Sequence, residues 1–140
     1  REATEIFHLA AAYDLDVRRP AAQRINVEGT SHVLDFAALA PRLARFQYVS
    51  TCYVSGRYTG IFRESDLERG QSFNNFYEET KYLAEIEVRD SMKAGMPVSI
   101  YRPAVVTGDS RRPTRSLPIA PHTASITSSS RRARFSLLPP

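Results

Sequence analysis

The chain has 140 residues, of which 42% are hydrophobic, and its mean hydropathy of −0.35 is that of an ordinary soluble domain. Its net charge is +4, but residues 1–110 hold all 15 acidic residues and only 13 of the 19 basic ones, which argues against a nucleic-acid-binding domain. No apolar run reaches about 18 residues and the first residues lack a secretory signal, so we expect a cytoplasmic protein without a membrane span.

The first part of the chain shows the pattern of a strand followed by a helix. The mainly apolar residues 5–10 are typical of a strand that is covered on both faces. A helix is predicted over residues 20–39, because Pro20 suits a first helical turn. Its apolar stripe is formed by Ile25, Val33, Leu34 and Ala37. Gly29 inside this helix costs about 1 kcal/mol relative to alanine, so we expect close packing there, with a tolerated surface glycine as the alternative.

The middle of the chain predicts a second strand, a loop and a second helix. Residues 45–50 (RFQYVS) form the strand, and the polar, turn-rich residues 57–73 form a loop over the strand ends. Asn75 is the expected N-cap of the helix, and Glu78 completes a pair that resembles a capping box. Gly95 marks the helix end.

The last patterned element is a third strand over residues 98–101 (VSIY). Because long helical connections join parallel strands, the order strand, helix, strand, helix, strand predicts an α/β fold with a parallel sheet, over residues 1–110. Residues 111–140 are rich in Arg, Ser and Pro and hold no acidic residue, so they are expected to be a disordered basic tail. A linker, an interaction arm or an out-of-frame translation would each give such a tail.

The sharpest chemical signal is YEETK, which places Tyr77 and Lys81 four residues apart on one helical face. Reducing a carbonyl needs a proton donor, and a phenol with a pKa of about 10 acts near neutral pH only if a positive charge favours its anion. Lys81 would supply that charge, and its donors could hold hydroxyls of a cofactor ribose. The alternative is a chance pair, which seven tyrosines and two lysines produce roughly one time in ten.

A second signal lies at the end of the second strand, which delivers Ser50 and Thr51 to the edge where ligands of open α/β sheets bind. A hydroxyl there can hydrogen-bond a substrate carbonyl and orient it. The alternative is a hydroxyl that bonds the backbone at the strand end. Cys52 follows, but without a histidine partner it predicts no thiolate nucleophile, and as the single cysteine it predicts neither an internal disulfide nor a metal site.

Taken together, these segments resemble the extended short-chain dehydrogenase/reductases over residues 4–110. The segments that carry the resemblance are IFHLAAA, NVEGT, VSTCYVSG, YEETK and YRPAVVTGDS, in family order. The resemblance implies a partial Rossmann-type doubly wound parallel sheet that binds NAD or NADP. Counting back from Gly56 places Thr51, not Ser50, at the family's catalytic hydroxyl.

The resemblance also implies roles for particular residues. Tyr77 is the implied general acid/base, Lys81 lowers its pKa and binds the ribose, and Thr51 positions the reacting oxygen. Asn26 completes the implied catalytic set, either through a relay or through the packing of its helix. The implied cofactor-binding residues are His8, Leu9, Ala10, Tyr77, Lys81, Arg102 and Pro103. A buried structural histidine is the alternative for His8, and a strand-end salt bridge is the alternative for Arg102.

Two details of the resemblance bear on the reaction. Ser55 stands where sugar-modifying epimerases usually carry tyrosine, and RPAVVTGDS is closer to the thioester reductase and fatty acyl-CoA reductase branch. The implied reaction is hydride transfer from NAD(P)H to an acyl thioester or the derived aldehyde. A nucleotide-sugar epimerase or dehydratase, or a hydroxysteroid-dehydrogenase-like enzyme, is the alternative. In each case the partner is a small molecule, and a homodimer is compatible with the resemblance.

A third detail is the absence of a Gly-rich phosphate-binding turn from the sequence. We therefore expect a fragment that lacks the first βαβ units of the family's nucleotide-binding domain. An inactive truncated fragment is a further alternative for the function.

Overall fold

The computed structural model describes residues 2–105, in which three strands alternate with helices. The strands are β1 (Glu5–His8), β2 (Arg45–Val49) and β3 (Val98–Tyr101). They pair in the order β1-β2-β3, and both pairs are parallel. The α/β class and the parallel sheet are thereby confirmed. The expected disordered tail lies outside the described residues.

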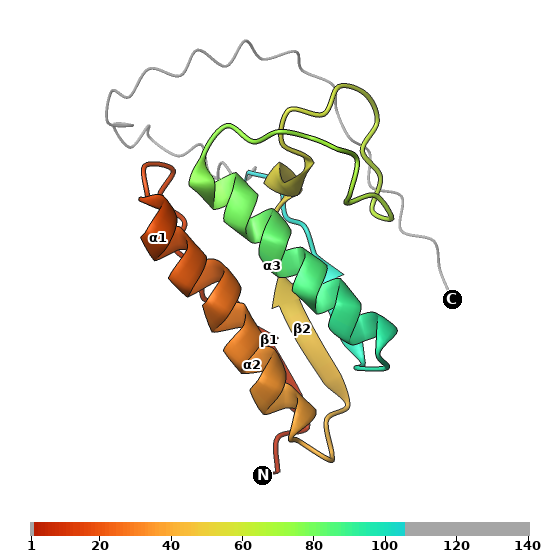
Figure 1. Ribbon diagram of the computed structural model, residues 1–140. Coiled ribbons are helices and arrows are strands. Elements are labelled where there is room, and N and C mark those ends of the chain that lie inside the picture. Colours follow the sequence, from red (N-terminus) through yellow and green to blue (C-terminus); the bar gives the residue numbers. More distant parts are fainter. Residues whose placement is uncertain (1, 106–140) are drawn as a thin grey trace, which may run out of the picture. The chain divides into compact units, whose positions relative to one another are not determined.

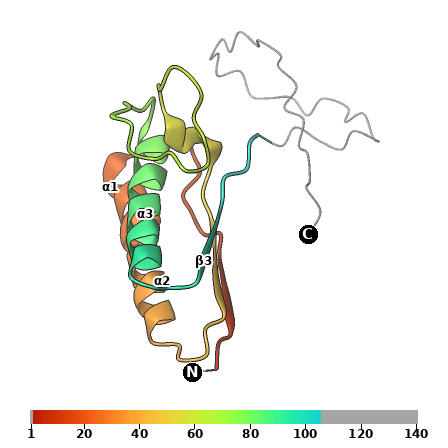
Figure 2. The same ribbon diagram turned by 90° about the vertical axis from the view of Figure 1, so that its right-hand side faces the viewer.

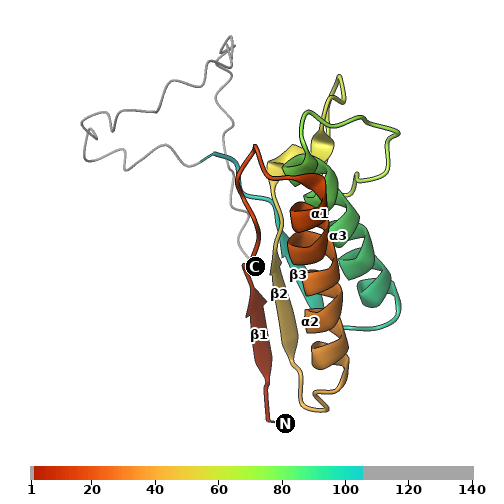
Figure 3. The same ribbon diagram turned by 60° about the vertical axis from the view of Figure 1, so that its left-hand side comes forward.

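The helices lie on one face of this sheet (Figures 1, 2 and 3). The first helical stretch is continuous and consists of α1 (Arg19–Ala22), the π-helical segment η1 (Gln23–Glu28) and α2 (Gly29–Ala38). The second is α3 (Phe76–Lys93). The strand order β1-β2-β3 means that both connections move across the sheet in the same direction. Since such crossovers are almost always right-handed, the two helical stretches cover the same face of the sheet.

The π-helical segment explains one failed expectation. The Gly29 N–H donates to the Arg24 carbonyl, five residues back, so this turn holds one residue more than an α-helical turn. Because of the additional residue, the sequence positions that face the core differ from those of a regular α-helix. Asn26 and Val27 are buried here, whereas Ile25 is 43% exposed. The expected place of Ile25 in the apolar stripe was therefore wrong. Close packing at Gly29 was wrong as well, because an added Cβ would meet only the Arg24 carbonyl, at an ordinary 3.7 Å.

The start of α3 is held by the expected N-cap. The Asn75 side chain accepts a hydrogen bond of 2.9 Å from the Glu78 N–H, and the Glu78 carboxylate accepts one of 2.9 Å from the Asn74 N–H. Glu78 thus reaches the residue before the N-cap rather than the N-cap itself, which differs slightly from the standard capping box. Among the described helices, none is long and apolar enough to cross a membrane.

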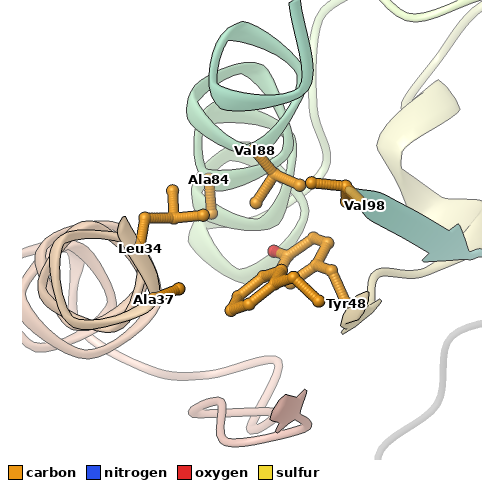
Figure 4. Packing of buried hydrophobic residues seen from close by; sticks show 7 residues of the cluster. Leu34, Ala37, Tyr48, Ala84, Val88 and Val98 are labelled. Carbon is orange, nitrogen blue, oxygen red and sulfur yellow. The ribbon is translucent and has the colours of Figure 1, made fainter. Parts of the chain in front are cut away.

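The core lies between the helices and the inner face of the sheet (Figure 4). Leu34 and Ala37 of α2 and Ala84 and Val88 of α3 converge on the inward-facing side chains of the strands. Tyr48 stands among them with no exposed surface. A fully buried tyrosine normally gives its hydroxyl a hydrogen-bond partner, and that partner belongs to the site described next.

Candidate active site

The candidate site lies at the carboxyl ends of the three parallel strands, beside the first half of α3 (Figure 1). Thr51 follows β2 and is the N-cap of the short 3₁₀ helix η2 (Cys52–Ser55). Tyr77 and Lys81 face this edge from the first two turns of α3. Sequence reasoning missed η2, because it predicted only a strand over residues 45–50 and a loop over residues 57–73.

Thr51 and Tyr77 both lie at this edge. Thr51 is 5% exposed, and its hydroxyl oxygen accepts a hydrogen bond of 3.2 Å from the Tyr53 N–H. Burial raises the pKa of Tyr77, and the nearby Thr51 hydroxyl acts on this pKa in the opposite direction. The neighbouring Ser50 is directed elsewhere, since its hydroxyl donates to the Glu85 carboxylate over 2.6 Å. Of the two hydroxyls at the strand end, Thr51 is therefore the one beside Tyr77.

Lys81 lies on the same helix but is directed toward the sheet. Its ammonium donates to the Tyr48 hydroxyl over 3.0 Å and to the Val49 carbonyl over 2.9 Å. The residue is 3% exposed, and burial lowers the pKa of Lys81 to about 8, an effect that Glu85 partly offsets. The expected lowering of the pKa of Tyr77 by Lys81 is not found, because burial raises this pKa and Lys81 is not among the groups that shift it.

Asn26 is 1% exposed and holds the loop after β1. Its side-chain oxygen accepts from the Ala12 N–H over 2.7 Å, and its NH₂ group donates to the Ala12 carbonyl over 3.1 Å and to the Thr80 hydroxyl over 3.0 Å. An asparagine side chain has two N–H donors, and both are used here. Of the two roles expected for Asn26, this geometry favours packing over a relay.

The residues at the end of β1 are divided between the interior and the surface. His8 is 7% exposed, and its Nε2 lies 2.9 Å from the Thr30 hydroxyl. Burial, with a smaller contribution from Lys81, lowers the pKa of His8. Leu9 and Ala10 are exposed just beyond the strand. The side chain of His8 thus occupies the buried structural position given as its alternative.

The side chain of Arg102 forms the salt bridge that was its alternative role. It pairs with Glu85, which has no exposed surface, over 2.6 Å, and it donates to the Asp66 carbonyl over 2.7 Å. Pro103 reaches the site through its backbone, because its carbonyl accepts a hydrogen bond of 3.2 Å from the Cys52 N–H. The end of β3 is therefore fastened to the turn that carries Thr51.

Sequence reasoning missed Tyr48, Thr30 and Glu85, which hold the side chains of the site. A signal for Tyr48 was present, since it alternates with Phe46 on the inward face of β2, and a buried phenol needs a partner. A weaker signal existed for Glu85, which lies four residues after Lys81 on one helical face. Nothing in the sequence indicated Thr30.

The residues present suit a dinucleotide better than a metal. A half-buried phenol, a buried alcohol and an ammonium with one N–H not engaged by residues 2–105 form a set of hydrogen-bond donors for hydroxyl and carbonyl oxygens. Within the same described range, no group of three or more His, Cys, Asp or Glu side chains gathers as a metal site would require.

Comparisons with known proteins agree with this geometry. The model of an NAD-binding family described as Male sterility protein matches residues 1–132. An alcohol-forming fatty acyl-CoA reductase from Simmondsia chinensis is 33% identical over 99 residues, which are 68% of this chain and 20% of the relative. The chain therefore spans about a fifth of the length of this curated relative.

Solved structures show the same fold. The terminal R domain of the myxalamid PKS-NRPS biosynthetic pathway is 34% identical, with a TM-score of 0.67 over 76% of this chain and 27% of that one. UDP-glucuronic acid 4-epimerase from Bacillus cereus, solved in complex with NAD, has a TM-score of 0.62 over 73% of this chain and 32% of its own. Its identity of 23% supports a likeness of fold alone.

Proposed function

Since the chain belongs to the NAD-binding family described as Male sterility protein, within the extended short-chain dehydrogenase/reductases, we propose that it contributes the catalytic residues of an NAD(P)-dependent reductase. The proposed substrate is an acyl thioester or the derived aldehyde. The observation that supports this most directly is that the buried Thr51 and the start of α3, which carries Tyr77, lie together at the carboxyl edge of a parallel sheet, near enough for Thr51 to act on the pKa of Tyr77.

In the proposed reaction, the two hydroxyls act on the substrate oxygen. Thr51 donates a hydrogen bond to the carbonyl oxygen and fixes its position beside Tyr77. Tyr77 gives its proton to this oxygen as negative charge develops there. The phenol has a raised pKa when Lys81 bonds only Tyr48 and Val49. For Tyr77 to act as the general acid, its pKa must therefore fall when substrate and nucleotide bind. This requires that binding bring the Tyr77 hydroxyl closer to the Lys81 ammonium.

NAD(P)H supplies the reducing equivalents when bound, and a subset of the described residues would hold it. The third N–H of Lys81 suits a ribose hydroxyl, and the exposed residues Leu9 and Ala10 suit the opposite side of the nucleotide. The side chains of His8 and Arg102 are committed to Thr30 and Glu85, so we assign them supporting roles. Pro103 remains a candidate through its position beside the Thr51 turn.

The choice of a thioester or aldehyde over a nucleotide sugar is supported by sequence similarity. The fatty acyl-CoA reductase and the myxalamid R domain are both more similar in sequence to this chain than the epimerase is. Ser55, where epimerases usually carry tyrosine, points the same way. We also propose a cytoplasmic location, which imaging of the tagged protein in its own cells would test.

The proposal is tested by the substitution Tyr77→Phe. The protein is incubated with NADH or NADPH and either a long-chain acyl-CoA or its aldehyde, and the loss of reduced nicotinamide absorbance is followed. We expect Tyr77→Phe to lower turnover by about 10² to 10⁴, because the general acid is lost while the ring is kept. Tyr82→Phe, which removes a hydroxyl from the same helix α3, is the matched control and should retain the activity.

Two outcomes would contradict the proposal. Unchanged turnover in the Tyr77→Phe protein removes Tyr77 from the mechanism. Failure of the wild-type chain to bind either nucleotide or to oxidise it with any of these substrates favours the inactive fragment. Nucleotide binding, followed separately by fluorescence, distinguishes a loss of chemistry from a loss of the cofactor site.

A further inference from the structure

We propose that the Tyr48 hydroxyl and the Val49 carbonyl form an acceptor pair that fixes the Lys81 ammonium and reserves its third N–H for a ligand at the carboxyl edge of the sheet. Tyr48 is then a positioning residue that acts through Lys81. The inference rests on the proposed function only in identifying that ligand as the ribose of a nicotinamide nucleotide. The fixed acceptor pair itself is a property of the protein alone.

The first support is the geometry of the pair. Tyr48 and Val49 are consecutive in β2, so the inward side chain of one and the backbone carbonyl of the next present two acceptors from a rigid strand. Their distances to Lys81 Nζ are 3.0 and 2.9 Å, both within the range of good hydrogen bonds. The ammonium also lies 4.5 Å from the centroid of the Tyr48 ring, where the ring face attracts a cation.

The second support is the direction of the hydrogen bonds around Tyr48. The Thr30 hydroxyl donates to the Asn26 carbonyl over 2.7 Å, which uses its one proton. The Thr30 hydroxyl also lowers the pKa of Tyr48, against the larger effect of burial. Because an ammonium has no acceptor, the Tyr48 oxygen accepts from Lys81, and the Tyr48 proton is directed away from the ammonium.

The third support is that no carboxylate among residues 2–105 forms an ion pair with the ammonium. Glu85, one turn further along α3, acts on Lys81 only through space, and its carboxylate accepts from Ser50, Arg89 and Arg102. His8 is buried nearby and bonds Thr30 rather than Lys81. The ammonium is therefore held by two neutral oxygens, and its charge is not cancelled where a ligand would meet it.

The test uses the full 140-residue chain with ¹³C-labelled lysine and follows both side chains by NMR while the pH is raised. The chain has only two lysines, and Lys93, whose side chain is 72% exposed, is an internal control. We expect Lys81 to titrate near pH 8, well below Lys93. In Tyr48→Phe the midpoint of Lys81 should fall by about a further pH unit, because an acceptor of the charged form is lost. Tyr82→Phe should leave it unchanged.

Two results would overturn the proposal. Coincident titration of Lys81 and Lys93 in the wild-type chain shows that the ammonium is not buried against β2. An unchanged Lys81 midpoint in a folded Tyr48→Phe chain shows that Tyr48 does not hold the ammonium. If Tyr48→Phe does not fold, Lys81→Met examines the contact from the other side, in a chain labelled with ¹³C at tyrosine. The Tyr48 Cζ resonance must then move while that of Tyr82 stays. No substrate or nucleotide is present, so this outcome is independent of the Tyr77→Phe activity test.

Discussion

The charge of Lys81 is buried, and this burial lowers the stability of the folded protein. The residue is 3% exposed, and burial lowers the pKa of its ammonium to about 8 from 10.5. Between these two pH values the unfolded chain binds one proton more than the folded chain, so stability rises with pH across this window. Below about pH 8 both states are protonated and the whole cost is present. A residue kept for its charge thus reduces the stability of the fold.

Replacing Lys81 with methionine should therefore stabilise the protein at neutral pH. Removing the buried charge recovers about 3 kcal/mol, whereas leaving the Tyr48 hydroxyl and the Val49 carbonyl without their donor costs about 1–2 kcal/mol. We expect a net gain of about 1–2 kcal/mol in the free energy of unfolding at pH 7, measured by urea denaturation. The gain should shrink above pH 8 and reverse near pH 10.5, where lysine is neutral in both states.

Lys93→Met is the control for this prediction, because the side chain of Lys93 is 72% exposed and pairs with Asp90 at the surface. Surface pairs of this kind contribute about 0–1 kcal/mol. A Lys81→Met protein that is less stable than wild type at pH 7 would show that the acceptor pair outweighs the desolvation of the ammonium.

Among individual residues, the sequence predicted the candidate catalytic side chains but not the side chains that hold them in place. Tyr77, Lys81 and Thr51 could be identified because a helical spacing and a strand end restrict where their side chains lie. The direction of the Lys81 ammonium could not, since it depends on Tyr48, which lies 33 residues away in sequence and meets Lys81 only in the folded core. The pKa of Tyr77, which was expected to be lowered, is instead raised by burial, and burial is set by contacts that form only in the folded chain.

Among the elements, the turn that ends η2 is tightly packed against the loop that follows it. Gly56 ends η2 with a φ of 50°, in the region that favours glycine. A Cβ at this position would collide with the Ser72 carbonyl and would lie 2.9 Å from the Phe73 ring. The loop of residues 57–73 therefore returns directly against the turn that carries Thr51, and only glycine fits between them.

Gly56→Ala should destabilise the protein by about 2–4 kcal/mol, because backbone strain and a steric collision add together. Gly70→Ala is a matched control, since Gly70 also has a positive φ, of 70°, but no atom within 4 Å of an added Cβ. We expect about 1 kcal/mol for the control, from backbone strain alone. Equal losses in thermal or urea unfolding would mean that the loop moves aside without cost.

The bounds of the elements were predictable where a capping residue defined them. Asn75 begins α3 through a hydrogen bond between neighbours in sequence, and such local chemistry is visible in a linear pattern. The π-helical segment was not predictable, because one additional residue in a turn leaves no mark on composition and is fixed by the contacts of Asn26 with Ala12 and Thr80. The apolar stripe was consequently assigned one residue, Ile25, that the structure exposes.

Across the described part of the molecule, Glu85 joins several elements that the sheet alone does not connect. Its buried carboxylate accepts hydrogen bonds from Ser50 at the end of β2 and from Arg102 after β3. Arg89 of α3 donates to it over 3.0 Å as well. Both arginines also bind backbone carbonyls of residues 63–66, so one carboxylate anchors the loop to the two strand ends.

Glu85→Gln should destabilise the whole fold by about 3–5 kcal/mol, because it leaves the two arginines with an uncompensated charge around a buried site. Glu79→Gln is the control: Glu79 pairs with Arg19 over 2.8 Å at the surface, where the loss should be about 0–1 kcal/mol. The comparison is made by urea denaturation. A Glu85→Gln protein that unfolds like the control would show that these elements are held by the core and not by the carboxylate.

The π-helical segment has a consequence for how this fold tolerates changes of length. Its wide turn takes up one residue more than an α-helical turn, so deleting one residue there would restore ordinary helical periodicity and leave Leu34 and Ala37 facing the sheet. The same deletion inside α2 would turn the residues that follow it by about 100° around the helix axis and move their apolar side chains out of the core. A gap should therefore be tolerated in the wide turn, provided that Asn26 is kept, and not in α2.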